Sequence, residues 1–234
     1  MRPDPEGTEA QNRHKGPGGT AVLDILDQHI PPGGVRRVLD FGCGVGAWLN
    51  DLQDRGWDTW GIEPSSSAAF VRHQRLQEIP SDGRFDLVMV YHVLEHLPHP
   101  LDTLRRLAAA VRAGGLCFVS VPRLDTVAIH RQFAYCLHPR HHIVAYTEAC
   151  LRGLLAGAGF EVVEALHELD AQFTAGKPLR MRLLTRRVAE PAAWPDPAKA
   201  LKTLLAQLEP LLLERAELRL KTADQPPPQT GSHG

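Results

Sequence analysis

The fold of this 234-residue chain is decided by the stretch VLDFGCGVG, which runs from Val38 to Gly46. It opens with bulky apolar residues, as in a strand that is buried inside a sheet. Three glycines follow at every second position, Gly42, Gly44 and Gly46, and they permit a tight turn that a ligand can approach closely. A helical pattern begins directly after the turn, over 47–55. This order of strand, glycine turn and helix predicts the first unit of an α/β sheet, with a ligand at the glycine turn.

Strand and helix patterns alternate along the rest of the chain. Further strands are predicted over 57–63, 85–91, 116–121, 161–165 and 179–187, and further helices over 20–30, 100–112 and 147–156. The helix over 100–112 should end in a glycine cap at Gly114 and Gly115. Such alternation predicts a doubly wound, mostly parallel α/β sheet with helices on both faces.

The chain divides into four parts by composition. Residues 1–18 are rich in proline, glycine and charge and are predicted to be disordered. One domain is expected over 19–188, with an insertion over about 123–146 that we interpret as a substrate lid, because it follows a strand at the ligand edge of the sheet. Leucine spacing predicts a C-terminal helical extension over 189–221, which could form a homodimer or bind a partner protein, and residues 222–234 are again predicted to be disordered.

Composition and charge disfavour several classes of function. The formal net charge is −1 and the isoelectric point is about 6.9, so no overall field favours nucleic acid or an acidic membrane surface. The arginines of the last strand are therefore interpreted as an exposed face and not as an RNA-binding strip: Arg180, Arg182, Arg186 and Arg187. No apolar run approaches the roughly 18 residues of a membrane span, and the N-terminus has no apolar signal segment. Four cysteines without a CxxC pair predict reduced thiols in a cytoplasmic protein.

Two acidic residues bear on the identity of the ligand at the glycine turn. Asp40 lies two positions before the first glycine, and Glu63 ends the second strand. A dinucleotide would also suit glycines at this spacing, but its pyrophosphate needs helix amides and no anion nearby. S-adenosylmethionine has no phosphate and carries an ammonium and a sulfonium, which suit a carboxylate beside the turn. Glu63 can accept both ribose hydroxyls as a bidentate acceptor.

Five segments of the chain, between about Val35 and Val163, resemble the class I S-adenosylmethionine-dependent methyltransferase superfamily, in its broad methyltransferase-domain group. They are VLDFGCGVG (38–46), GIEPS (61–65), FDLVMVYHVLEHLPHP (85–100), LRRLAAAVRAGGLCFVSVP (104–122) and YTEACLRGLLAGAGFEV (146–162). The resemblance implies a Rossmann-like fold with a seven-stranded sheet, and an enzyme that uses S-adenosyl-L-methionine. It implies these cofactor-binding residues: Asp40, Gly42, Cys43, Gly44 and Gly46 for the methionine part, Glu63 and Pro64 for the ribose, and Tyr91 and His92 beneath the sulfonium.

One region departs from the pattern of the superfamily. Only 21 residues (64–84) separate Glu63 from Phe85, which predicts a helix of about one turn or none. Many members place an acid after the third strand to bind the adenine amine, but Arg75 or Leu76 occupies that place here. Backbone groups or Gln74 are then expected to recognise the adenine.

Histidines are the candidates for catalysis. A base is needed only if the nucleophile carries a proton, and His92 is the first candidate and His142 the second. If a helix begins at His92, then His92, Glu95 and His96 share one face and could bind a metal ion together with His142. The competing interpretation is that Glu95-His96 is the ordinary helix-start motif of the superfamily, bonded to the backbone of the next loop.

The main functional hypothesis is methyl transfer to an oxygen, nitrogen or carbon nucleophile of a small molecule, in cell-envelope sugar or secondary-metabolite biosynthesis. The second is a metal-assisted methyltransferase that acts on an RNA end or a diol. The third is a non-catalytic cofactor-binding scaffold that recruits a partner through the C-terminal helices. A nicotinamide oxidoreductase is the most distant alternative. The methyl acceptor, the pathway and the oligomeric state do not follow from the sequence.

Overall fold

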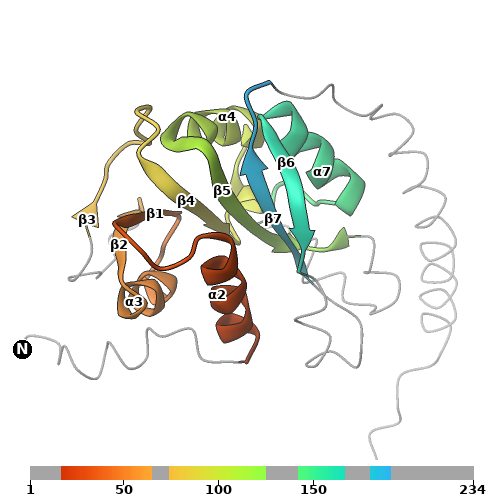
Figure 1. The fold of residues 1–234 in the computed structure, drawn as a ribbon. Helices are drawn as coiled ribbons and strands as arrows, with labels where there is room; N and C mark the ends of the chain where they lie inside the picture. Colours follow the sequence, from red (N-terminus) through yellow and green to blue (C-terminus); the bar gives the residue numbers. More distant parts are fainter. Residues whose placement is uncertain (1–16, 65–73, 125–141, 167–179, 191–234) are drawn as a thin grey trace, which may run out of the picture. The chain divides into compact units, whose positions relative to one another are not determined.

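The computed structural model describes residues 17–64, 74–124, 142–166 and 180–190 of the chain (Figure 1). These residues belong to a compact unit, Met1–Pro195, and a second unit, Asp196–Gly234, lies outside them. Four predicted parts of the chain also lie wholly or mostly outside the described residues: the N-terminal segment, the lid, the C-terminal extension and the tail.

A single twisted sheet carries the described strands in the order β3-β2-β1-β4-β5-β7-β6. Its strands are β1 Arg36–Phe41, β2 Trp57–Ile62, β3 Gln74–Arg75, β4 Phe85–Tyr91, β5 Val111–Pro122, β6 Phe160–Ala165 and β7 Arg180–Arg187. From β3 to β5 the neighbouring strands are parallel, and β7 runs antiparallel to both β5 and β6. The prediction of a doubly wound, mostly parallel α/β sheet is confirmed.

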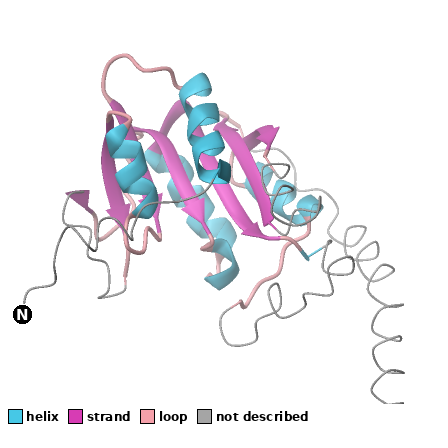
Figure 2. Ribbon diagram, turned by 90° about the horizontal axis from the view of Figure 1, so that it is seen from below, coloured by secondary structure: helices cyan, strands magenta, loops and turns pink. Residues whose placement is uncertain are grey.

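Helices cover both faces of this sheet (Figure 2). One apolar core joins α2 (Pro17–His29) and α3 (Ala47–Asp54) to the sheet, and another joins α4 (Pro100–Ala110) and α7 (Glu148–Gly157) to the opposite face. Side chains of β4 alternate between the two cores, with Leu87 and Met89 in the first and Val88 and Val90 in the second. This alternation follows from the two-residue repeat of a strand, and it explains why the central strands are apolar without interruption.

The start of α2 and the end of α4 differ from the predictions. Helix α2 begins at Pro17, three residues before the predicted helix start at residue 20. Helix α4 ends at Ala110, and Val111 already pairs with Phe85 as the first residue of β5. The predicted glycine cap is therefore wrong, because Gly114 and its neighbour lie within β5, where the pairing with β4 shifts register.

No helix forms between β3 and β4 in the described residues 74–84. The guanidinium carbon of Arg84 lies 4.7 Å from the ring centre of Trp60 and 5.3 Å from that of Phe85. A stacked guanidinium covers aromatic surface much as an apolar side chain does. Arg84 thus covers part of the surface of these two aromatic side chains on the sheet.

The arginines of β7 are not the uniformly exposed row that was predicted. Arg182 is 2 % exposed and Arg180 is half-buried, because β7 lies between β5 and β6 and both of its faces are covered. None of the described helices has the length and apolar character needed to cross a membrane. Cys43, Cys117 and Cys150 are free thiols, and the cytoplasmic location stays a prediction.

Ion pairs join α2 to the start of β1 and to the end of α3. Arg36 Nη1 lies 2.6 Å from Asp27 Oδ1, and Arg55 Nη1 lies 2.7 Å from Asp27 Oδ2. Arg55 also contacts Asp24, at 2.8 Å. Burial raises the pKa of Asp27, but the hydrogen bonds from Arg55 and Arg36 outweigh burial and hold this pKa below its ordinary value.

Asp27→Asn should lower the free energy of unfolding at pH 7 by about 1.5–3 kcal/mol, the scale of hydrogen bonds to charged groups. Because the folded pKa is depressed, this stability is present above the ordinary pKa of 3.8 and is lost as the pH falls through the folded value. Denaturant unfolding at pH 7 and pH 3 measures both effects. Asp24→Asn is the control, because the Asp24 side chain is 57 % exposed and its loss should cost less than about 1 kcal/mol. Equal losses in the two variants would contradict the assignment.

Candidate active site

The glycine turn is bonded to the end of the neighbouring strand. The amides of Gly42 and Cys43 both donate to the carbonyl oxygen of Ile62, at 2.8 and 3.2 Å. Gly42 has a φ of 78°, and a Cβ atom there would lie 2.4 Å from Cγ2 of Val93. Glycine is therefore required at this position for two reasons, its left-handed backbone and the close packing of Val93.

Two carboxylates meet beside the turn. Asp40 is 2 % exposed between β2 and β4, and its Oδ1 has no hydrogen-bond partner among the described residues. Burial, and then the charge of Glu63, raise the pKa of Asp40 to about 7. Glu63 accepts a hydrogen bond from the Gly44 amide at 2.9 Å. A buried carboxyl with an unsatisfied oxygen next to a second acid favours a cationic ligand.

The end of β4 provides an aromatic side chain and a histidine. The Tyr91 ring makes edge contacts with Trp48 of α3 at 5.4 Å and with His92 at 4.7 Å, between ring centres. His92 has a φ of 56°, in the left-handed region that residues other than glycine rarely adopt. Its amide donates to the Ser120 carbonyl at 2.8 Å, and its Nδ1 lies 3.0 Å from Glu95 Oε1. Such backbone strain is found preferentially at functional sites.

A second group of side chains follows directly. Ligand atoms of Glu95, His96 and His142 all lie within 4.8 Å of one another. Glu95 is 1 % exposed, and its Oε2 has no hydrogen-bond partner in the part of the chain that is described. The Tyr146 hydroxyl donates to the Leu94 carbonyl at 3.0 Å, which holds the segment of His142 against that of His96.

Two expectations about this group need correction. The helix here is a 3-10 helix of three residues, Leu94–His96, and His92 lies before it. The predicted shared helical face is therefore wrong. Of the four residues predicted for a metal site, the cluster contains three. The helix-start interpretation expected bonds to the backbone of the next loop, but Glu95 is bonded to a more distant segment and to His92. The carbonyl oxygen of Glu95 accepts from the amides of Ile143 and Val144, whereas its carboxylate contacts His92.

The two ends of the predicted lid lie next to each other at the edge of the sheet. The Leu124 amide donates to the Tyr146 carbonyl at 2.9 Å, which closes the base of the insertion. Most of the insertion predicted over about 123–146, namely residues 125–141, lies outside the described residues.

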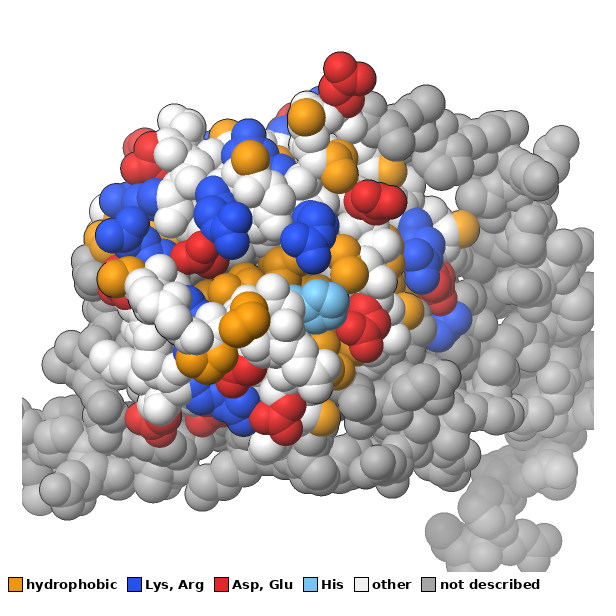
Figure 3. All heavy atoms as spheres, in the orientation of Figure 1, with side chains coloured by type: hydrophobic (Ala, Val, Ile, Leu, Met, Phe, Trp, Pro, Cys, Tyr) orange, Lys and Arg blue, Asp and Glu red, His pale blue; other side chains and the backbone are white. Residues whose placement is uncertain are grey.

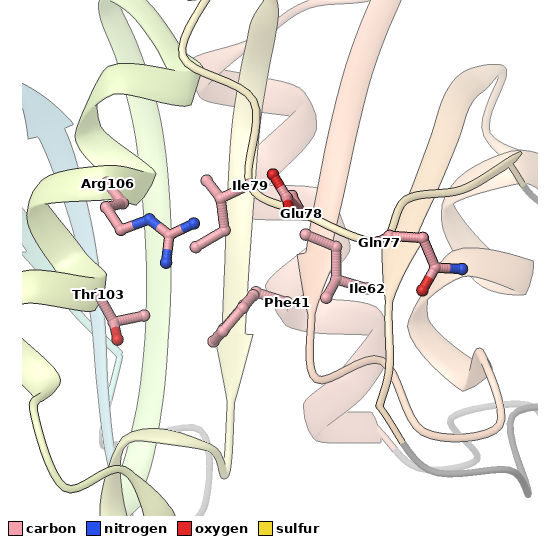
Figure 4. Close-up of a pocket in the computed structure, with 7 residues that line it drawn as sticks. All are labelled: Phe41, Ile62, Gln77, Glu78, Ile79, Thr103 and Arg106. Atoms are coloured by element: carbon pink, nitrogen blue, oxygen red, sulfur yellow. The ribbon is translucent and has the colours of Figure 1, made fainter.

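A pocket of about 350 Å³ lies on the α4 face of the sheet, beside the ends of β1 and β2 (Figure 4). Its lining residues are Phe41, Ile62, Gln77, Glu78, Ile79, Thr103 and Arg106. The pocket adjoins Ile62, the residue before Glu63. It adjoins the connection from β3 to β4, which contains no helix in its described residues; residues 65–73, where the short spacing before Phe85 also predicted little or no helix, lie outside the described part of the chain.

Arg180 is a residue of this edge that the sequence did not reveal. Its Nη1 donates to the Tyr91 hydroxyl at 2.6 Å. Because β7 is antiparallel, it begins at the edge where the parallel strands end, and Arg180 pairs with Pro122 of β5. No local pattern in the sequence signals this contact.

On the molecular face shown in Figure 3, basic and acidic side chains are interspersed.

Comparison with known proteins identifies relatives of the chain. A family model described as a methyltransferase domain matches residues 12–165. A ubiquinone biosynthesis O-methyltransferase from Aromatoleum aromaticum is 32 % identical over 114 residues, which cover 42 % of this chain and 48 % of the relative. The chain spans about half the length of the first curated relatives that it matches.

Solved structures show the same fold at lower identity. An S-adenosylmethionine-dependent methyltransferase from Mesorhizobium loti is 20 % identical, with a TM-score of 0.55 over 74 % of this chain and 100 % of that chain. A 1,6-didemethyltoxoflavin-N1-methyltransferase from Burkholderia thailandensis, solved with S-adenosylhomocysteine, is 19 % identical, with a TM-score of 0.54 over 73 % and 78 % of the two chains. With the family match over residues 12–165, the chain belongs to the methyltransferase-domain family of the class I S-adenosylmethionine-dependent methyltransferases.

Proposed function

We propose that this protein transfers the methyl group of S-adenosyl-L-methionine to a small-molecule acceptor. The observation that carries this proposal is the buried carboxyl of Asp40, with its unsatisfied oxygen, beside Glu63 at the glycine turn. The ammonium of the cofactor would compensate this charge. A dinucleotide would instead bring a pyrophosphate toward two acids, which disfavours the nicotinamide alternative.

The residues of the turn fit the cofactor in the roles that the family implies. Those for the methionine part are Asp40, Gly42, Cys43, Gly44 and Gly46; those for the ribose are Glu63 and Pro64. The Gly44 amide donates to the Glu63 carboxylate, which would accept hydrogen bonds from the two ribose hydroxyls. Tyr91 and His92 would lie beneath the sulfonium. When bound, the cofactor supplies a methyl group on this sulfonium.

The adenine is assigned to the pocket on the α4 face. That pocket adjoins Ile62, so it is adjacent to the carboxylate proposed for the ribose. Its apolar wall of Phe41, Ile62 and Ile79 suits the faces of a flat heterocycle, and the amide of Gln77 suits its polar edge (Figure 4).

His92 is proposed as the general base for a nucleophile that must lose a proton, and His142 as the second candidate. As a carboxylate, Glu95 can only accept, so it fixes the His92 proton on Nδ1 and leaves Nε2 as the basic atom. The O-methyltransferase named among the relatives favours an oxygen nucleophile over nitrogen or carbon. Cell-envelope sugars and secondary metabolites are the proposed settings.

A metal-assisted reaction on a diol or an RNA end is the second candidate function. The observation that favours it is the Glu95, His96 and His142 cluster, in which Oε2 of the buried Glu95 has no partner among the described residues. One carboxylate and two imidazoles form a donor set that divalent transition metals accept. These three residues would bind the ion, which would polarise an acceptor hydroxyl.

The cofactor assignment predicts measurable binding of S-adenosylhomocysteine by calorimetry. Glu63→Ala should weaken binding by about 1.5–3 kcal/mol, through loss of a charged hydrogen-bond acceptor. Gly44→Arg should abolish binding because it fills the turn, and Thr103→Trp should weaken it because it fills the pocket. Arg105→Trp, on the same helix but outside the pocket, is the control. Unchanged affinity in the first three variants would refute the assigned site, and binding without any turnover would favour the scaffold alternative.

Affinity for S-adenosylhomocysteine should depend on pH through Asp40. The pKa of Asp40 is about 7 in the free protein, so below pH 7 its carboxyl is largely protonated. The ligand ammonium needs the ionised carboxylate, so ligand binding below pH 7 must release the Asp40 proton. We therefore expect the Kd to fall as the pH rises from 5.5 to 7 and to level off above 7. Asp40→Asn should bind weakly at every pH. The same variant should be more stable than the wild type at pH 8 without ligand, because stability is lost as the pH rises through a raised folded pKa. A pH-independent wild-type Kd would contradict this role.

The metal alternative predicts saturable binding of Mn²⁺ or Zn²⁺ by calorimetry, with loss of binding in Glu95→Gln and His142→Ala. Glu161→Gln, an exposed acid on β6, should bind the ion as the wild type does. Inhibition of turnover by a chelator, reversed by added ion, would support the metal-assisted reaction. Equal ion binding by all of the variants would exclude the cluster as the site.

A further inference from the structure

Tyr91 is held from three sides at the end of β4. Trp48 of α3 contacts one side of its ring, the following His92 contacts another, and the hydroxyl accepts a hydrogen bond from Arg180 of β7 at 2.6 Å. The contact between Arg180 and Tyr91 joins residues 89 positions apart. Two strands that are not neighbours in the sheet, β4 and β7, are thereby linked at the ligand edge.

The strand register explains how this link is made. Tyr91 pairs with Ser120 of β5, and Ser120 pairs with Arg182 of β7. Arg180 pairs with Pro122, so its backbone lies two positions closer to the ligand edge than that of Arg182. To reach Tyr91, the guanidinium must extend across β5. This geometry exists because β7 enters the sheet antiparallel, with its first residue at the carboxyl ends of β4 and β5.

We propose that Arg180 is a positioning residue, which holds the Tyr91 side chain in the orientation that binds the cofactor. This inference rests on the proposed function, in which Tyr91 lies beneath the sulfonium. A guanidinium has donors and no acceptor, so the direction of the bond is unambiguous and the hydroxyl hydrogen of Tyr91 points to a different atom. A bond to a charged donor is also stronger than one between neutral groups, and it removes rotational freedom of the phenol before the ligand arrives. Arg180 therefore acts through Tyr91 and does not touch the reacting atoms.

The test combines a spectroscopic signature with a double-mutant cycle. The chain has three tyrosines, so protein labelled with 3-fluorotyrosine gives three ¹⁹F resonances, and Tyr91→Phe assigns that of Tyr91. Arg180→Met should shift or broaden this resonance in the absence of ligand. It should also weaken S-adenosylhomocysteine binding about three- to tenfold, the effect of one lost hydrogen bond. In a Tyr91→Phe background, Arg180→Met should change the affinity less than about twofold, because the hydroxyl through which it acts is gone.

Two further variants complete the design. Arg180→Lys keeps the charge and a donor and should restore part of the affinity, which guards against a folding defect in Arg180→Met. Arg186→Met alters an exposed arginine of the same strand that donates to the Gly114 carbonyl, and it should leave both readouts unchanged. Equal losses from Arg180→Met in both backgrounds, or no loss in either, would overturn the proposal. If the wild type binds no S-adenosylhomocysteine while the Tyr91 resonance still responds to Arg180→Met, the proposed function fails and the contact stands.

Discussion

Asp40 lies at the carboxyl end of the central strand β1, enclosed by β2 and β4, and the folded chain leaves one of its oxygens without a hydrogen bond among the described residues. Burial and the neighbouring Glu63 raise its pKa to about 7, so the ionised form is costly until a cation arrives. The rest of the site is arranged around this carboxyl. The glycine turn leaves room for a ligand beside it, and the bond from Gly44 to Glu63 fixes the second acid.

The two halves of the proposed site share the loop that follows β4. Val93 packs where a side chain on Gly42 would have to lie, so the glycine turn and this loop are in close contact. The same loop contains the strained His92, its partner Glu95 and the start of the Glu95, His96 and His142 cluster. A cofactor at the turn and an acceptor at the histidines would therefore both lie against this one loop. This coupling suits an in-line transfer that depends on close alignment of the reacting groups.

The short connection between β2 and β4 borders the sheet face on the α4 side. Arg84 stacks on Trp60 and Phe85 and covers part of their surface. The pocket beside Ile62 adjoins the same region (Figure 4). The region proposed for the adenine is thus bordered by a connection that, in its described residues 74–84, contains no helix.

The sequence by itself determined the strand and helix order, the glycine turn and the placing of Asp40 and Glu63 at the ends of β1 and β2. These features depend on two-residue and 3.6-residue periodicity and on turn chemistry, which act over a few neighbouring residues. Only the tertiary structure decided that Arg182 is buried, that Arg180 reaches Tyr91, and that His142 lies beside His96 and Glu95 while His92 contacts Glu95 from outside the cluster. Those outcomes depend on the antiparallel entry of β7 between β5 and β6 and on the hydrogen bond from Tyr146 to Leu94 in the 3-10 helix Leu94–His96. Contacts of this kind join residues far apart in the chain, and no local pattern encodes them.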